Sequence, residues 1–142
     1  MGTISKNFDY REFEKSDTAK RLGIINIINT SEVRDAIKAL VLEVLQPLRD
    51  AWGPLSINSG YRCKKLNEAV GGVATSQHCK GEAADIACPE PAKLAQLAYD
   101  LRLPYDQMIL YPTFVHFSHK LNGGQRKQIL YNAKYGGKKV VD

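Results

Sequence analysis

The sequence predicts a single α+β domain, in which a small antiparallel sheet carries helices packed on one side. The length of 142 residues suits one domain and leaves little room for two. The strongest helical pattern comes early, at residues 31–48, and strand-like runs gather after residue 55. Helices and strands that are segregated along the chain, rather than alternating, are typical of the α+β class. We therefore treat residues 1–142 as one domain.

The first third of the chain is predicted to be helical. Residues 1–28 mix aromatic side chains with charged ones and are expected to form short helical turns packed onto the body of the domain. Thr30 and Ser31, followed by Glu32, are typical of a helix start. Apolar residues from 33 to 48 then recur at helical spacing and form one wide stripe, as expected of the main core helix. Pro47 lacks an N–H group and should kink or end this helix.

The remaining elements are short. A helix is expected at residues 64–70, where Gly71 and Gly72 permit its exit, and another should begin near Pro91. Five runs of apolar, β-branched or small residues are predicted as strands, and they are 55–59, 83–87, 108–111, 114–118 and 128–133. The two runs around Pro112 and Thr113 should form a hairpin.

The charge is +5, and basic residues are concentrated in residues 119–142, which we interpret as a basic C-terminal extension of the same domain. A basic surface favours polyanions such as cell-wall polymers. No basic–aromatic recognition motif accompanies the charge, so nucleic acid is not an expected partner. No apolar run reaches 18 residues, and the first residues lack the apolar core of a signal peptide. We therefore expect cytoplasmic synthesis without membrane insertion.

Three polar residues point to a metal site: His78, Asp85 and His116. On its predicted strand Asp85 shares a face with two alanines, which leave room for a ligand to approach the carboxylate. Alone, His116 would more often be a satisfied core histidine. Two histidines and one aspartate on neighbouring sheet elements match the three protein ligands and open position of catalytic zinc, so one Zn²⁺ per chain is expected. His119 should face the other way.

The sequence around these three residues is a more specific indication than their spacing alone. The pattern His78-x-x-Gly81-x-Ala83-x-Asp85, together with residues 114–118, resembles the M15 peptidases. These are zinc D-alanyl-D-alanine carboxypeptidases, dipeptidases and phage L-alanyl-D-glutamate endolysins, and the Hedgehog signalling domain shares their fold. Five further stretches of the sequence are similar to the small branch of M15 that is common in phage and bacterial genomes. These stretches are residues 45–49, 59–62, 66–67, 70–72 and 105–107.

The resemblance covers about residues 7–118 and implies a Hedgehog/DD-peptidase-like fold. It implies that His78, Asp85 and His116 hold zinc, and that Arg62 binds or polarises substrate beside it. A guanidinium can pair with a peptide carboxylate or stabilise an oxyanion. The alternative for Arg62 is a surface ion pair at a strand end.

The general base is the part of the family pattern that this sequence lacks. Better-known relatives carry Glu or Asp three residues before the last histidine, where this chain has Thr113, which cannot accept a proton at neutral pH. Asp106 is the candidate base, with a turn or capping role as its alternative. Glu82 should point away from the site by strand parity.

Three further residues are candidates for substrate binding. Ser76 and Gln77 precede the first histidine, and they are expected either to donate hydrogen bonds around the site or to cap its loop. Tyr111 could orient substrate or stabilise charge, but a phenol is a poor base.

Two functions of different classes follow. The first is zinc-assisted hydrolysis of an amide in a peptidoglycan stem peptide, as a DD- or LD-carboxypeptidase or endopeptidase, by a monomer. The second is a non-catalytic, zinc-stabilised module that binds cell wall or protein. Either could be of phage or bacterial origin, released to the wall by a holin-type partner or carried on a virion. A nucleic-acid-binding domain is a third, weaker reading, which predicts salt-sensitive DNA binding that survives chelation.

Overall fold

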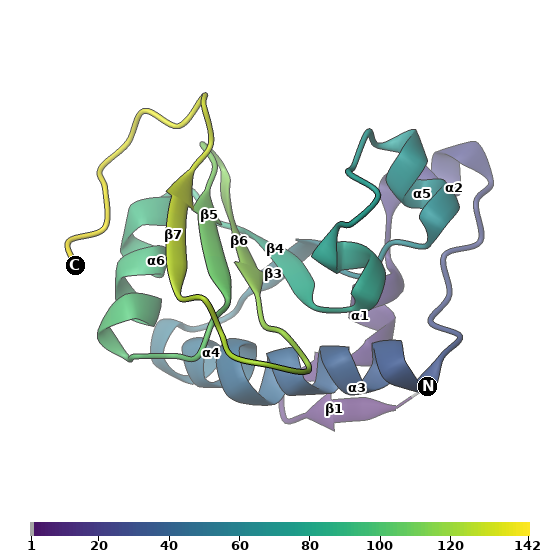
Figure 1. The fold of residues 1–142 in the computed structure, drawn as a ribbon, viewed down its shortest axis with the longest axis horizontal. Coiled ribbons are helices and arrows are strands. Elements are labelled where there is room, and N and C mark those ends of the chain that lie inside the picture. Colours follow the sequence, from purple (N-terminus) through teal and green to yellow (C-terminus); the bar gives the residue numbers. More distant parts are fainter. Residues whose placement is uncertain (1) are drawn as a thin grey trace.

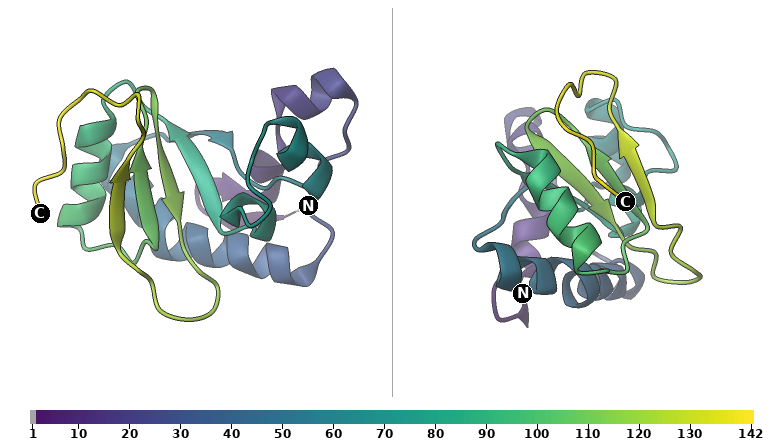
Figure 2. Two further views of the ribbon diagram at one scale, coloured as in Figure 1. Left: turned by 45° about the horizontal axis from the view of Figure 1, so that its top comes forward. Right: turned by 90° about the vertical axis from the view of Figure 1, so that its left-hand side faces the viewer.

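The structure is a computed structural model that describes residues 2–142. Residue 1, which belongs to the predicted domain and its N-terminal segment, lies outside the described residues. A five-stranded sheet forms one layer, and the long helical segment and α6 pack against it (Figure 1, with two further views in Figure 2). The elements are β1 (Thr3–Ser5), β2 (Phe8–Asp9), α1 (Tyr10–Glu14), α2 (Asp17–Leu22), α3 (Ser31–Leu40), η1 (Val41–Leu45), α4 (Gln46–Trp52), β3 (Ser56–Ser59), α5 (Lys64–Ala69), η2 (Gln77–Lys80), β4 (Ala83–Ala87), α6 (Pro91–Asp100), β5 (Gln107–Leu110), β6 (Phe114–Ser118) and β7 (Gln128–Tyr131).

The sheet has the strand order β3-β4-β6-β5-β7. Its first three pairings are antiparallel, which confirms the predicted hairpin of β5 and β6, while β7 pairs in parallel with β5. The parallel pairing follows from where β6 ends. Because β6 runs antiparallel to β5, its last residue lies beside the start of β5, and the loop of residues 119–127 returns the chain to that same end. The sheet is therefore mixed, within the predicted α+β class.

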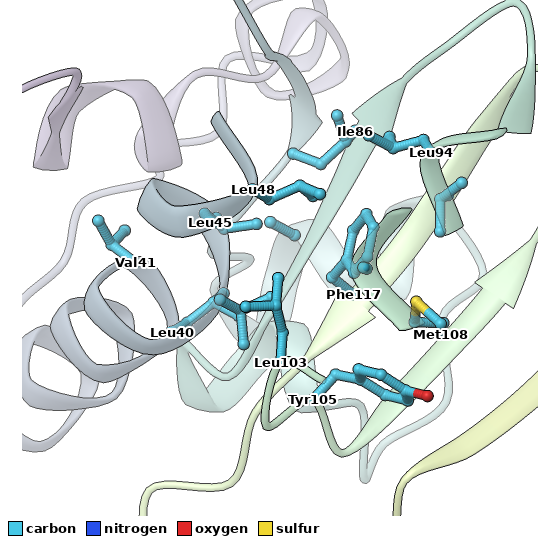
Figure 3. Close-up of a cluster of buried hydrophobic side chains, with 14 of the residues drawn as sticks. Leu40, Val41, Leu45, Leu48, Ile86, Leu94, Leu103, Tyr105, Met108 and Phe117 are labelled. Atoms are coloured by element: carbon cyan, nitrogen blue, oxygen red, sulfur yellow. The ribbon is translucent and has the colours of Figure 1, made fainter. Parts of the chain in front are cut away.

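One face of this sheet forms the hydrophobic core. Alternate residues of the central strands are fully buried there: Ala84 and Ile86 on β4, and Val115 and Phe117 on β6. They pack against the predicted apolar stripe and against α6, as Figure 3 shows. The buried partners from the helices include Leu40, Val41, Leu45, Leu48 and Leu94. The other face of β4 and β6 carries Asp85 and His116.

The long helix differs from the prediction at Pro47. Thr30 caps the helix as predicted, because its side chain accepts a hydrogen bond from the Val33 N–H. The helix neither ends nor breaks at Pro47. It widens into the π-helical turn η1, in which the Gln46 N–H donates to the Val41 carbonyl, and continues as α4. Pro47 occupies the first turn of α4, where a missing N–H costs little.

The N-terminal segment contains the predicted helical turns, α1 and α2, and also the small antiparallel sheet of β1 and β2, which the sequence did not indicate. Asp9 begins α1 with a capping box. Phe13 is fully buried, and its carbonyl accepts a hydrogen bond from the Tyr61 N–H just beyond β3. The segment is thus fastened beside the end of β3. Within residues 2–142, no helix combines the length and apolar character required to cross a bilayer.

Candidate metal centre

The structure brings the three predicted ligands together. His78, Asp85 and His116 each offer one ligand atom, and these atoms lie within 4.8 Å of one another. Asp85 on β4 and His116 on β6 are direct cross-strand partners. Their neighbours along the strands, Ile86 and Val115, point into the core, so Asp85 and His116 lie on the opposite face. His78 comes from η2, just before β4.

The His78 ring is held in one orientation. Its Nδ1 lies 2.7 Å from the Gly60 carbonyl oxygen, which can only accept, so Nδ1 carries the proton. The other ring nitrogen, Nε2, then faces Asp85 Oδ1 at 3.3 Å. The Ser76 hydroxyl accepts a hydrogen bond from the His78 N–H at 3.2 Å and begins the turn. A backbone partner of this kind fixes the tautomer that a metal-binding histidine needs.

Asp85 is the charged centre of the cluster. Its Oδ1 lies 2.9 Å from Nδ1 of His116. Burial raises the pKa of the Asp85 carboxyl, but hydrogen bonds and charge from His116 and His78 outweigh burial and hold that pKa well below its usual range. The group is thus a carboxylate between two imidazoles. Two nitrogen donors and one carboxylate oxygen fit Zn²⁺, which accepts this donor set in catalytic sites with three protein ligands.

A cavity of about 530 Å³ lies against Asp85. Residues 15–18 of the N-terminal segment line it, and Asn58 and Ser59 line it from β3. Its other lining residues are Tyr61, Arg62, Leu66, Val70, Tyr111 and Phe114. The cavity therefore joins the metal cluster to Arg62 and Tyr111, two of the residues that the sequence indicated for substrate binding.

Arg62 is positioned for a ligand that the protein itself does not supply. Its backbone N–H donates to the His78 carbonyl at 3.2 Å, and its Nη1 donates to Asn67 Oδ1 at 3.0 Å. Its Nε is buried and has no hydrogen-bond partner among the described residues. A Cβ at Gly72 would lie 2.8 Å from Nη1, so a side chain there would displace the guanidinium. Because Arg62 lines the cavity, its guanidinium suits an anionic group of a substrate.

Tyr111 lies on the same cavity, in the loop between β5 and β6. Its ring stacks on Phe114 with centroids 4.2 Å apart. Burial raises the pKa of the Tyr111 phenol, and the charge of Asp85 raises it further, against the opposing effect of Arg62. Tyr111 therefore keeps its proton at neutral pH and can donate a hydrogen bond, but it cannot serve as a base.

Gln77 and Asp106 lie in a separate polar network. The Gln77 amide donates to Glu82 Oε1 and to Asp106 Oδ2, both at 3.2 Å. Asp106 is fully buried and accepts further hydrogen bonds from Arg126, the shortest at 2.7 Å. Burial raises the pKa of Asp106, but the hydrogen bonds and charge of Arg126 outweigh it and lower that pKa.

Neither Gln77 nor Asp106 lines the cavity at Asp85. This geometry does not support the general-base role predicted for Asp106, because both carboxylate oxygens are occupied by donors. Ser76 caps the turn, which is the second of the two roles expected for it. Glu82 accepts from Gln77 and from the Leu121 N–H, in the same network.

Sequence reasoning missed the contribution of residues 15–18, which it treated as packing. Asp17 lies in the first turn of α2 and lines the cavity. Among the described residues that line it, Asp17 and Asp85 are the two that carry a carboxylate. Ser16 and Asp17 read as an ordinary helix start, so the sequence carried no signal for a second role. Thr113 is exposed in the hairpin turn.

The comparisons with known proteins identify the family of the chain. A family model described as Peptidase M15 matches residues 6–119. The match includes His78, Asp85, His116 and Arg62, and it leaves out β7 and the rest of residues 120–142. No curated protein matches the chain.

Proposed function

This chain belongs to the M15 peptidase family, and from that premise we propose that it is a zinc-dependent metallopeptidase of bacterial peptidoglycan, which hydrolyses an amide bond in a stem peptide. The observation that carries the proposal is the cluster of His78, Asp85 and His116, whose ligand atoms lie within 4.8 Å of one another beside a cavity. A metal centre built this way needs only water and substrate to complete it.

A zinc ion held there supplies Lewis acidity, which lowers the pKa of a water molecule towards about 7 and polarises the amide carbonyl. The chain's own residues orient the reactants. The Gly60 carbonyl holds His78 with its Nε2 towards Asp85. The Arg62 guanidinium, which lines the cavity, binds the substrate carboxylate or the developing oxyanion, and the Tyr111 phenol donates a hydrogen bond to the substrate.

Two features support a cell-wall peptide as the substrate. Stem peptides end in a carboxylate, which suits the Arg62 guanidinium that lines the cavity. The chain is also basic, with a charge of +5, which favours association with anionic wall polymers. Cleavage by a DD-peptidase and cleavage by an LD-peptidase both agree with this chemistry. Analysis of the digestion products distinguishes the two activities.

The first experiment measures zinc in the purified protein and the release of peptides from purified peptidoglycan. We expect about one zinc per chain in the wild type. His116→Ala should lose zinc and cleavage together, whereas His119→Ala is the matched control, because His119 is outside the cluster. Wild-type protein that contains zinc and cleaves no type of peptidoglycan would refute the peptidase, and protein without zinc affinity would refute the metal site.

A second function is favoured by one observation. The position where better-known relatives carry an acid is Thr113, and its side chain is not among those that line the cavity. A non-catalytic, zinc-stabilised module that binds cell wall would show stoichiometric zinc and co-sedimentation with peptidoglycan, without released peptides. The same assay therefore decides between the two functions.

A further inference from the structure

The two carboxylates that line the cavity differ in what they contact. Asp85 lies between His78 and His116 and belongs to the metal cluster. Asp17 comes from the N-terminal segment, where it is exposed in the first turn of α2. It takes part in none of the ion pairs in the described part of the chain. The Asp17 carboxylate is therefore available to a ligand in the cavity.

The other charged side chains of the lining are basic. They are Lys15 and Arg62, and the ion pairs of the described residues include neither of them. A metal ion at the cluster adds further positive charge and occupies Asp85. Most of the cavity then favours anionic groups, and Asp17 is the group of the lining that can pair with a cationic one.

The segment that carries Asp17 is fastened next to Arg62. The Tyr61 N–H donates to the Phe13 carbonyl at 2.8 Å, and the Asn26 side-chain amide donates to the Tyr61 carbonyl at 2.9 Å. These two bonds join Tyr61, the residue before Arg62, to the chain on either side of Asp17. The fold thus holds an acidic and a basic side chain on one cavity, as a preorganised binding site requires.

Resting on the proposed function, we propose that Asp17 binds an ammonium group of the stem peptide, while Arg62 binds its carboxylate. A cavity of about 530 Å³ lies within the range of about 300–1,000 Å³ found for small-ligand sites. Stem peptides contain a diamino acid, whose side-chain amine is a free ammonium until a cross-link acylates it. The amino terminus of a peptide released from the glycan carries the same charge. Asp17 thereby selects stem peptides with a free amine.

The test compares three synthetic peptides that share the bond cleaved in peptidoglycan and end in a free carboxylate. The first has an acetylated amino terminus and a lysine as its diamino acid. The second replaces that lysine by Nε-acetyl-lysine, which imitates the acylated amine of a cross-link. The third contains Nε-acetyl-lysine and a free amino terminus. A preference for the first peptide over the second assigns the ammonium to the diamino acid, and a preference for the third assigns it to the amino terminus.

We expect the wild type to favour a charged peptide about fivefold in kcat/KM at low salt, the upper range for an exposed ion pair. In about 1 M salt, where the Debye length is about 3 Å, the preference should fall towards onefold. Asp17→Asn should reduce it to about onefold at low salt, and Asp17→Glu, which keeps the charge, should retain a preference.

Glu68→Gln is the matched control. Glu68 is an exposed carboxylate on α5, the helix that contributes Leu66 and Val70 to the cavity, but Glu68 does not line it. Figure 1 shows α5 and α2 at the same end of the molecule, so the two variants remove the same charge from one region. Glu68→Gln should keep the wild-type preference. Zinc content and melting temperature of each variant show that the fold and the metal site are intact.

An Asp17→Asn enzyme with the wild-type preference, or a wild type that cleaves all three peptides equally well, would overturn the ammonium site and leave the peptidase standing. A wild type that cleaves neither peptidoglycan nor the peptides would instead remove the proposed function, and the ammonium site with it.

Discussion

Replacing Asp106 by asparagine tests whether the buried carboxylate is a structural group. In the wild type, Oδ1 accepts from the Arg126 backbone at 2.8 Å and Oδ2 accepts from Arg126 Nη2 at 2.7 Å. The Gln77 amide is a third partner, at 3.2 Å. An asparagine presents one amide nitrogen to these donors and leaves at least one of them unpaired. Breaking a buried ion pair costs about 3–5 kcal/mol, and we expect about 3 kcal/mol, because the Arg126 side chain is 43% exposed and can regain water.

The pH dependence makes the test sharper. The pKa of Asp106 is lowered in the folded protein, and that of an unfolded aspartate is about 3.9. Between these two values the unfolded chain binds more protons, so the free energy of unfolding rises with pH. The contribution of Asp106 is therefore complete above about pH 5 and is lost as the pH falls through the folded pKa. The difference between wild type and Asp106→Asn should be largest at neutral pH and shrink below pH 4.

Urea denaturation from pH 3 to pH 7, in chelator so that metal binding does not contribute, measures both quantities. Asp35→Asn is the control, because Asp35 is an exposed aspartate on α3. A loss below about 1 kcal/mol at pH 7, or an equal loss at pH 3 and pH 7, would refute the structural role. A stable variant without catalytic activity would return Asp106 to consideration as a general base.

Four further predictions concern the metal centre. Zinc added to chelated protein at about 1,000 times its Kd should stabilise the fold by about 4 kcal/mol, and thermal unfolding without a zinc-dependent shift would contradict this. Arg62→Lys should lower kcat/KM about 100-fold with zinc content unchanged, because a lysine cannot reproduce the guanidinium geometry; an unaltered rate would contradict the assigned role. Thr113→Glu should leave kcat within about twofold of the wild type, because residue 113 is exposed in the hairpin turn and does not line the cavity; a rise of about 100-fold would show that position 113 reaches the reacting water. Gly60→Ala should destabilise the protein by about 2 kcal/mol and weaken zinc binding about tenfold in a metal titration, because its Cβ would lie 2.7 Å from Phe13 Cα and its carbonyl orients His78; wild-type values for both would contradict the packing.

Some of this architecture was predictable because it depends on local periodicity. Alternation along 83–87 predicted that Asp85 shares a face with two alanines rather than with Ile86, and the burial of Ile86 on the core face confirms it. Asp85 and His116 are thirty-one positions apart in the sequence, however, and a whole helix and a strand lie between them. That the two residues become direct cross-strand partners depends on how β4 docks beside the hairpin, which no local pattern specifies.

Other features were hidden because both partners had to be known. Asp106 looked available as a base, since nothing near it in sequence indicates that Arg126, twenty residues later, occupies its carboxylate. Nothing in the sequence indicated a role for Asp17 at the site, because the cavity that it lines exists only after the N-terminal segment folds against β3. The parallel pairing of β7 was missed for a related reason: strand propensity predicts that a strand forms, and the loop before it decides the direction.

The C-terminal segment illustrates how charge can mislead when read only from the sequence. Arg126 contributes to the basic excess, yet its guanidinium binds the buried Asp106 rather than a polyanion. Asp106 in turn holds the Gln77 amide, and Gln77 is the first residue of the turn that carries His78. This chain of contacts connects a segment outside the family match to the metal centre. Loss of residues 120–142 should therefore expose Asp106 and remove β7 from the sheet.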